Sequence, residues 1–247
     1  MSGSTPRPAE ITRPQKIPNS RYAICFLFLL LPPIFAGVGG DVLPTNDEYL
    51  FKTQMQMTMQ PIINSNLPEF KVPAYTKSKG FHEVSNEDLK GRWSVLFFYP
   101  GDFTFVCPTE LADLADNYAE FQQIGVDIYS VSTDSHFVHK AWQDTSEAVK
   151  KVQYTMLADM RFELARAFGV MIEEAGQAYR GTFLIDPDGK VRVAEIHDNG
   201  IGRDAQELLR KVRAAQFIYE HPGEVCPAKW KQGDATLKPS IDLVGKI

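Results

Sequence analysis

The chain has 247 residues, of which 44% are hydrophobic, so it can bury the core of one large domain or two small ones. Its net charge of −5 and its lack of a strong Lys/Arg cluster argue against a nucleic-acid-binding protein, which needs a basic face. Three cysteines are too few for a disulfide-stapled secreted domain, and their odd number leaves at least one unpaired within the chain. No linker interrupts the middle of the sequence, which favours one domain.

Residues 1–58 differ in kind from the rest, and we predict that they form a leader outside the domain, which then spans residues 59–247. Basic residues precede an apolar run at 22–31 and small residues at 36–40, a pattern typical of a secretory signal. The run is shorter than the ~20 residues of a membrane span, and two prolines follow it. We therefore expect no membrane span, and we interpret Cys25, inside the run, as an apolar filler.

An upstream start codon is the alternative explanation of this leader. Met55, Met57 and Met59 stand just before the domain, and a chain that began at Met59 would keep the whole domain. The residues by themselves leave both explanations open.

The domain opens with an irregular or hairpin region at residues 70–75 and 80–84 and continues into a short apolar run. Residues 94–99 are β-branched and aromatic enough for a buried strand, and a Pro-Gly pair ends it. Apolar residues at helical spacing then predict a helix over 108–123, with Pro108 in the first turn and Gly125 after its end.

The next segment predicts a second buried strand at residues 126–132 and a helix at 135–150 with Ser135 as its N-cap. We expect the core face of that helix to carry Phe137, Ala141, Trp142 and Val149. Two strands joined by a helix within about 40 residues form a parallel pair. The sequence therefore predicts an α/β fold with the two strands side by side.

The last third predicts a strand at 156–157, a helix at 161–168 and two strands at 182–185 and 191–196. Asp-Pro-Asp-Gly between the last two has strong turn chemistry, so they form a hairpin. A long helix follows at 203–219, whose residues at core spacing are Leu208, Leu209, Val212, Gln216 and Tyr219. The order β-α-β-α-β-β-α predicts a central mixed sheet flanked by helices.

The position of Cys107, just before the predicted helix, affects its chemistry. Backbone N–H groups and the positive end of a helix favour the thiolate over the thiol, and the thiolate is the reactive form. A free cysteine is as often a small buried hydrophobe, so the helix start alone does not decide between a reactive and a structural Cys107.

The residues around Cys107 also match a family pattern. Pro100, Thr104 and Cys107 form P-x-x-x-T-x-x-C within FFYPGDFTFVCPTEL, which resembles the peroxidatic signature of the peroxiredoxins. The resemblance covers about 61–247 and runs through VDIYSVSTDSHFVHKAW, GTFLIDPDGK, GIGRDAQELLRK and HPGEVCPAKW. Its C-terminal part resembles the bacterial alkyl hydroperoxide reductase branch of the family. The resemblance implies a thioredoxin-like fold, which agrees with the predicted order of elements.

The resemblance also implies roles for particular residues in a thiol-dependent reduction of hydrogen peroxide and alkyl hydroperoxides. Cys107 attacks the peroxide and becomes a sulfenic acid. Thr104 offers its hydroxyl to the sulfur and the peroxide, Pro100 shields the pocket from water, and Arg180 stabilises the thiolate and the transition state. Cys226, in the HPGEVCP motif, is the resolving cysteine, which forms a disulfide with Cys107 of a second subunit.

The family further implies the partners of the chain. We expect a homodimer linked by Cys107–Cys226 disulfides when oxidised, assembling into a ring of five dimers, with no bound cofactor and no metal. Electrons come from a dedicated flavoprotein reductase or from thioredoxin. Because the family works with cytoplasmic reductants, we favour a cytoplasmic protein and a start at Met59, with export as the alternative.

Two other functions are alternatives to the peroxidase. Some members of the family act as ring-forming chaperones, but the retained Cys107, Thr104 and Arg180 favour the enzyme. A disulfide reductase of the thioredoxin kind is less consistent with the sequence, which lacks a C-x-x-C pair.

Three further features receive plain interpretations. Asp134, His136 and His139 suggest a metal site, but the two histidines lie on one helix without a third strong ligand nearby, so we expect an exposed helix face there. Glu110 lies in the first turn of the helix, where a carboxylate is favoured, and its family equivalent helps to hold the active-site network. Residues 198–202 replace the Gly-Gly-Leu-Gly loop of peroxide-sensitive relatives, and no Tyr-Phe tail follows, so we expect resistance to over-oxidation.

Overall fold

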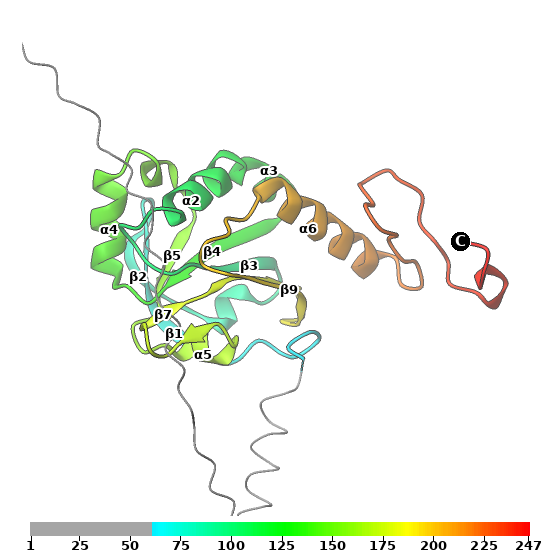
Figure 1. Cartoon of the computed structure of the whole chain (residues 1–247), viewed down its shortest axis with the longest axis horizontal. Helices are drawn as coiled ribbons and strands as arrows, with labels where there is room; N and C mark the ends of the chain where they lie inside the picture. Colours follow the sequence, from blue (N-terminus) through cyan, green and yellow to red (C-terminus); the bar gives the residue numbers. More distant parts are fainter. Residues whose placement is uncertain (1–60) are drawn as a thin grey trace, which may run out of the picture. The chain divides into compact units, whose positions relative to one another are not determined.

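The computed structural model describes residues 61–247 (Figure 1). The predictions made for residues 1–58, including Cys25, lie outside this part of the chain. The described part has a seven-stranded sheet in the order β2-β1-β5-β4-β3-β8-β9 and a separate two-stranded ribbon. The sheet is mixed and helices flank it, so the predicted thioredoxin-like α/β fold is confirmed.

The strand β3 (Trp93–Phe98) lies near the middle of the sheet, and all six of its side chains are buried. It pairs in parallel with β4 (Val126–Ser132), which pairs in parallel with β5 (Thr155–Ala158). On its other side β3 pairs antiparallel with β8 (Arg180–Ile185), which forms the predicted hairpin with β9 (Val191–His197). The N-terminal hairpin of β1 (Lys71–Thr76) and β2 (Gly80–Ser85) completes the far edge.

Alternation along β3 divides the core in two. Val95 and Phe97 contribute to one cluster, with side chains of α2 (Cys107–Asp116), α3 (Tyr118–Gln123) and α6 (Ala205–Glu220). Leu96 and Phe98 contribute to the other, with α5 (Glu163–Ala167) and the N-terminal hairpin. The residues that follow β3 therefore leave the end of a strand that is buried on both faces and lead into α2.

The predicted single helix over 108–123 is two helices. They meet at Asn117, whose side-chain amide donates hydrogen bonds to the Asp113 carbonyl oxygen at 2.8 Å and to its carboxylate at 3.2 Å. An Asn side chain that bonds the preceding turn competes with the regular helix, which explains the break. The start was predicted within one residue, since α2 begins at Cys107.

Two predictions for the helix α4 (His136–Thr145) are wrong, namely its end and two residues of its core face. It ends at Thr145, and a separate short 3-10 turn holds Val149–Lys151. Phe137 is 63% exposed and Ala141 is exposed, so neither belongs to the core face. The buried face is instead His139, Trp142 and Gln143, because the two polar side chains find buried hydrogen-bond acceptors.

His139 also corrects the interpretation of that helix as an exposed histidine face. Its side chain is 0% exposed, whereas His136 three residues earlier is half-buried. Within residues 61–247 no group of three His, Cys, Asp or Glu side chains is placed to hold a metal ion.

The C-terminal helix α6 begins after Asp204, whose carboxylate accepts hydrogen bonds from the backbone of Gln206 and Glu207. Of the residues predicted for its core face, Leu208, Leu209 and Val212 are buried, whereas Gln216 is half-buried and Tyr219 is 39% exposed. The small ribbon of β6 (Met171–Ile172) and β7 (Gln177–Ala178) was not predicted, because two-residue strands have no periodicity to detect. None of the helices among residues 61–247 is both long and apolar enough to span a membrane.

Candidate active site

Cys107 is the first residue of α2, directly after the loop that leaves the central strand β3. Its side chain is completely buried, and Pro108 follows it in the first turn of the helix. The helix start directs backbone N–H groups and the positive end of the helix dipole toward this position. The structure thus places Cys107 at a helix start, as the sequence predicted.

Arg180, at the start of β8, lies next to the sulfur. Its Nη1 is 3.4 Å from the Cys107 sulfur and 2.6 Å from the Glu110 carboxylate. Its Nε and Nη2 both donate to the Asn199 carbonyl oxygen, at 3.0 and 2.8 Å. The structure thus brings together Cys107 and Arg180, 73 residues apart in sequence.

Glu110 joins a second guanidinium to this cluster. The Arg203 Nε donates to one Glu110 oxygen at 2.9 Å and its Nη2 to the other at 3.1 Å. Arg203 also donates to the Gly181 carbonyl and the Thr182 hydroxyl, and its guanidinium carbon lies 3.3 Å from the Phe97 ring centroid. Burial lowers the pKa of the Arg203 guanidinium, although it stays charged beside Glu110.

Arg203 was not among the predicted site residues. The sequence showed it only as the start of the last helix, and no spacing rule links it to Cys107. Glu110 was interpreted as a first-turn carboxylate, and the structure adds that its side chain is 1% exposed and bridges two arginines.

Thr104 and Pro100 lie in the same loop as Cys107. Pro100 is buried directly after β3. The Thr104 hydroxyl donates a 2.7 Å hydrogen bond to the Gly101 carbonyl oxygen, so the predicted donation to the sulfur is not the arrangement seen here. Because a hydroxyl oxygen also has two lone pairs, Thr104 keeps the capacity to accept a hydrogen bond.

A second buried polar group lies behind this loop. The Tyr99 hydroxyl donates to one oxygen of Asp102 at 2.7 Å, and the His139 Nδ1 lies 2.8 Å from the other. Burial and the Asp102 charge hold the pKa of the Tyr99 hydroxyl well above its usual range. Sequence reasoning missed this group, because nothing in the spacing of Asp102 and His139 signals that they meet.

Cys226 lies in a different environment, in the tail that follows α6. Its sulfur is half-buried and 3.9 Å from the Ala214 carbonyl oxygen. Burial, followed by the negative charge of Glu224, raises the pKa of the Cys226 thiol. Trp230 fixes the tail to α6 through Phe217, with ring centroids 5.2 Å apart.

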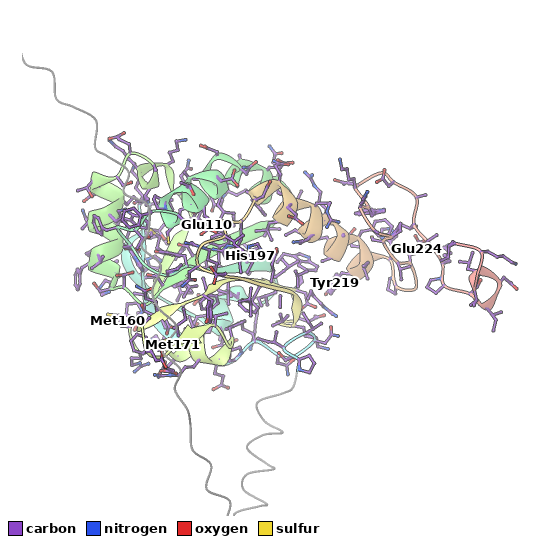
Figure 2. All side chains as sticks on the ribbon, viewed as in Figure 1. Glu110, Met160, Met171, His197, Tyr219 and Glu224 are labelled. Carbon is purple, nitrogen blue, oxygen red and sulfur yellow. The ribbon has the colours of Figure 1, made fainter. Side chains whose placement is uncertain are left out.

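The two cysteines therefore lie in separate parts of the molecule. Figure 2 shows Glu110, in the first turn of α2, within the body of helices and sheet, and Glu224 in the tail beyond α6. Both cysteines are free thiols. Among residues 61–247, the tail makes hydrogen bonds and aromatic contacts to one other element, the helix α6.

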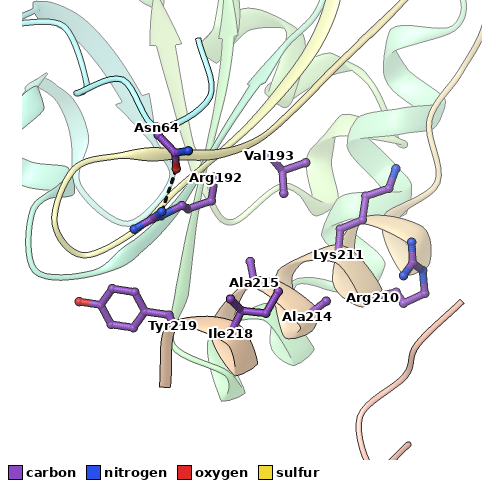
Figure 3. Close-up of a pocket in the computed structure, with 9 residues that line it drawn as sticks. All are labelled: Asn64, Arg192, Val193, Arg210, Lys211, Ala214, Ala215, Ile218 and Tyr219. Carbon is purple, nitrogen blue, oxygen red and sulfur yellow. Dashed lines mark hydrogen bonds between the residues drawn. The ribbon is translucent and has the colours of Figure 1, made fainter. Parts of the chain in front are cut away.

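A groove of about 510 Å³ lies between β9 and α6 (Figure 3). Arg192 of β9 and Lys211 of α6 line it, together with Ala214, whose carbonyl contacts Cys226. Asn64 holds Arg192 by a 2.8 Å hydrogen bond. Cys107 and Arg180 are not among the lining residues, so this groove is separate from the buried sulfur.

Comparison with known proteins decides the family. The AhpC/TSA family profile matches residues 63–194, and the profile of the C-terminal domain of 1-Cys peroxiredoxin matches residues 214–246. Alkyl hydroperoxide reductase C of Staphylococcus saprophyticus is 57% identical over 187 residues, which are 75% of this chain and 99% of that protein. The Escherichia coli protein of the same name is 56% identical over 186 residues, with the same coverage.

This chain belongs to the AhpC/TSA family.

Solved structures of the family agree with the fold. The crystal structure of Enterococcus faecalis AhpC has a TM-score of 0.66 and 50% identity, and the match covers 68% of this chain and all of that one. The reduced 2-Cys peroxiredoxin of Plasmodium vivax has a TM-score of 0.71 and 32% identity, over 74% of this chain and 96% of that one. The predicted family is confirmed, and with it the enzyme class, a thiol-dependent peroxidase of antioxidant function.

Proposed function

We propose that Cys107 is the residue with which this AhpC/TSA family member reduces hydrogen peroxide and alkyl hydroperoxides. The observation that supports it is the buried Cys107 sulfur, at the start of α2 and 3.4 Å from the Arg180 guanidinium. A fixed cation beside a helix start stabilises a thiolate before the reaction and a departing oxyanion during it. No cofactor is needed for this step, because the thiol itself is oxidised.

The first step oxidises the sulfur. The Cys107 thiolate attacks one peroxide oxygen, a sulfur–oxygen bond forms, and the oxygen–oxygen bond breaks. The other oxygen leaves with the electron pair, takes a proton and departs as water or an alcohol. Arg180 stabilises the oxyanion, Thr104 accepts a hydrogen bond from the peroxide O–H, and Pro100 excludes water. Cys107 is then a sulfenic acid.

The second step is resolution by Cys226 of another subunit. The Cys226 sulfur attacks the sulfenic sulfur, a disulfide forms and water leaves. The position of Cys226 against Ala214 of α6, in a tail whose contacts go to that helix, favours a partner sulfur from a second copy of the chain. An external dithiol, supplied by a flavoprotein reductase or thioredoxin, then returns the disulfide to two thiols.

Two surfaces favour the expected assembly of dimers into a ring of five. The strand β9 ends the sheet order and leaves an open edge with Ile196 51% exposed, which suits pairing with a second copy. An aromatic face of Phe81, 47% exposed, and Phe137, 63% exposed, lies on β2 and α4. Exposed aromatic residues that pack on one another are typical of an interface between subunits.

The cytoplasm is the compartment that we propose. A disulfide that must be reduced in every cycle depends on the dithiol supply of a reducing compartment. Finding the natural protein in the periplasm, cut near residues 36–40, would contradict this proposal.

Peroxide consumption by cysteine variants tests the proposed function. Cys107→Ser should abolish turnover, whereas Cys226→Ser should complete the first oxidation, release one equivalent of product and fail to recycle. Intact mass of the wild-type protein should show disulfide-linked dimers after oxidation, and neither variant should form the Cys107–Cys226 bridge. Full multi-turnover activity in Cys226→Ser, with the protein reductase as the only electron donor, would show that the resolving residue is assigned wrongly.

A further inference from the structure

Behind the loop that carries Pro100 and Thr104 lies a buried polar group that the steps above leave unused. Both Asp102 and His139 have side chains that are 0% exposed. Both oxygens of Asp102 are occupied, one by the Tyr99 hydroxyl at 2.7 Å and the other by His139 Nδ1 at 2.8 Å. Burial of a carboxylate is costly unless its partners are in place, so these contacts are required in the folded chain.

The second ring nitrogen of His139 determines where the protons lie. His139 Nε2 is 3.1 Å from the Leu157 carbonyl oxygen, which can only accept, so Nε2 carries a hydrogen. At Nδ1 one proton lies between the ring and the Asp102 carboxyl group, since the two atoms are 2.8 Å apart. His139 and Asp102 are therefore hydrogen-bonded to each other in the interior, where both side chains are closed to solvent.

The backbone of Asp102 is fixed as well. Its N–H donates a 2.8 Å hydrogen bond to the Asp134 carboxylate, which also accepts from the Ser132 hydroxyl at 2.8 Å. The loop between β3 and α2 is thus attached to the end of β4, to α4 and to β5. These three elements contribute no group to the sulfur cluster of Cys107, Arg180 and Glu110.

The residue after Asp102 shows why such an attachment is needed. Phe103 has φ of 56°, in the left-handed region that a bulky side chain rarely adopts. Such a conformation persists only where the surroundings hold it. The next residue is Thr104, whose hydroxyl points back to the Gly101 carbonyl, so the strained residue lies between the anchored Asp102 and Thr104.

We propose that His139 is a positioning residue for the peroxide reaction, which acts through Asp102 to hold the loop that places Pro100 and Thr104 around the Cys107 sulfur. The proposal rests on the proposed role of Cys107 in the attack on peroxide. Attack on peroxide depends on the alignment of Thr104, Arg180 and the sulfur, and a misplacement of ~1 Å costs about 100-fold in rate. Alkylation of the same sulfur by iodoacetamide does not use Thr104.

The experiment compares these two reactions in one background, Cys226→Ser, where Cys107 reacts once and stops. His139→Gln removes the imidazole that is bonded to Asp102, Tyr99→Phe removes one hydrogen bond to Asp102 and keeps the ring, and His82→Gln is the matched control. His82, on β2, bonds only the Gly80 carbonyl among its described partners. Stopped-flow oxidation by hydrogen peroxide and alkylation of Cys107 are measured for each variant, with circular dichroism as a check of folding.

We expect His139→Gln to slow oxidation by about 10–100-fold and to leave alkylation equal or faster, because the loop is looser while the thiolate persists. Tyr99→Phe should slow oxidation by a smaller factor, and His82→Gln should match the parent. Unchanged oxidation in His139→Gln, or an equal fall in both reactions, would overturn the proposal. If His139→Gln does not fold, unchanged oxidation in Tyr99→Phe overturns it.

A different result would concern the proposed function itself. If peroxide forms no sulfenic acid on Cys107 in the Cys226→Ser parent, the assignment of Cys107 fails and the positioning role falls with it. The other result is that peroxide oxidises Cys107 in the Cys226→Ser parent while His139→Gln leaves the ratio of the oxidation rate to the alkylation rate unchanged. In that case the assignment of Cys107 stands and the positioning role alone is wrong.

Discussion

The two cysteines of the domain show opposite environments. Cys107 is completely buried at a helix start, with the Arg180 guanidinium 3.4 Å from its sulfur. Cys226 is half-buried in a tail, its sulfur contacts a carbonyl oxygen, and its pKa is raised by burial and by Glu224. The first sulfur lies at a helix start beside a fixed cation, whereas the second lies in a segment attached to α6 by few groups.

Charge balance explains why the first environment is tolerated inside the protein. Arg180 and Arg203 bring two positive charges to a region that is almost closed to solvent, and Glu110 brings one negative charge. A Cys107 thiolate supplies the second negative charge and makes the cluster neutral. Buried charges are stable when they are paired, so the cluster and the thiolate favour one another.

The largest effect on this contrast is expected from Glu110→Gln. The variant keeps the shape of the side chain but leaves two buried guanidiniums facing each other without their shared carboxylate. Breaking a buried ion pair by removal of one partner costs about 3–5 kcal/mol. Urea unfolding should show this loss of free energy of unfolding, and the rate of Cys107 oxidation should fall with it.

Glu173→Gln is the matched control for that variant. Glu173 forms an exposed pair with Arg166, at 2.7 Å, where solvent competes with the partner. Its unfolding curve should overlay the wild-type curve. Equal changes in the free energy of unfolding in Glu110→Gln and Glu173→Gln would mean that the buried cluster stabilises the fold no more than an exposed ion pair does.

A smaller effect is expected from Arg180→Lys, which keeps the charge and removes the planar fork. One ammonium cannot contact the Cys107 sulfur, the Glu110 carboxylate and the Asn199 carbonyl in the geometry of the guanidinium. We expect oxidation of Cys107 to slow by about 10–100-fold. This loss of rate is no larger than the loss that follows removal of an oxyanion donor. Alkylation of Cys226 should not change, and Arg166→Lys serves as the control. An unaltered oxidation rate in Arg180→Lys would show that the guanidinium of Arg180 has no role in the oxidation of Cys107.

These contrasts also show how far the sequence could be interpreted. The strand before Cys107, the start of the helix after it and the hairpin of β8 and β9 all follow from local patterns, and the structure confirms them within a few residues, although that helix is broken at Asn117. Arg180 and Cys226 became candidates through the family resemblance. Their roles stay predictions until the variants are measured.

The sequence did not predict the residues whose hydrogen-bond partners are far away along the chain. Arg203 bonds Glu110, 93 residues away, and His139 bonds Asp102, 37 residues away. Periodicity places a polar residue on the surface unless a buried partner is known, which is why α4 was assigned Phe137 for its core in place of His139. Only the folded chain shows that these polar groups are satisfied inside.

The tail of Cys226 predicts resistance to over-oxidation. The tail meets α6 through Trp230 and Ala214, so few buried contacts oppose its movement toward a sulfenic acid. Disulfide formation should then outcompete further oxidation of Cys107. Mass spectrometry after a series of peroxide doses should find sulfinic acid on Cys107 in Cys226→Ser and several-fold less in the wild type. Equal amounts in the two proteins would contradict a mobile resolving segment.

The smallest effect is expected at Glu224, whose charge is the second cause of the raised pKa of Cys226, after burial. In Glu224→Gln the thiolate of Cys226 is no longer opposed by that charge, so its pKa falls toward the ordinary value without reaching it, because burial remains. At a pH below the pKa, a lower pKa means a larger thiolate fraction, so alkylation of Cys226 at pH 7.5 should accelerate in Glu224→Gln. At a pH well above the pKa both proteins are fully ionised, and their rates should converge. The control is Glu220→Gln, an exposed carboxylate at the end of α6, which should leave the profile in place. A slower reaction in Glu224→Gln would mean that Glu224 orients the tail through its contacts with Thr236 and Lys238 rather than acting by its charge on the sulfur.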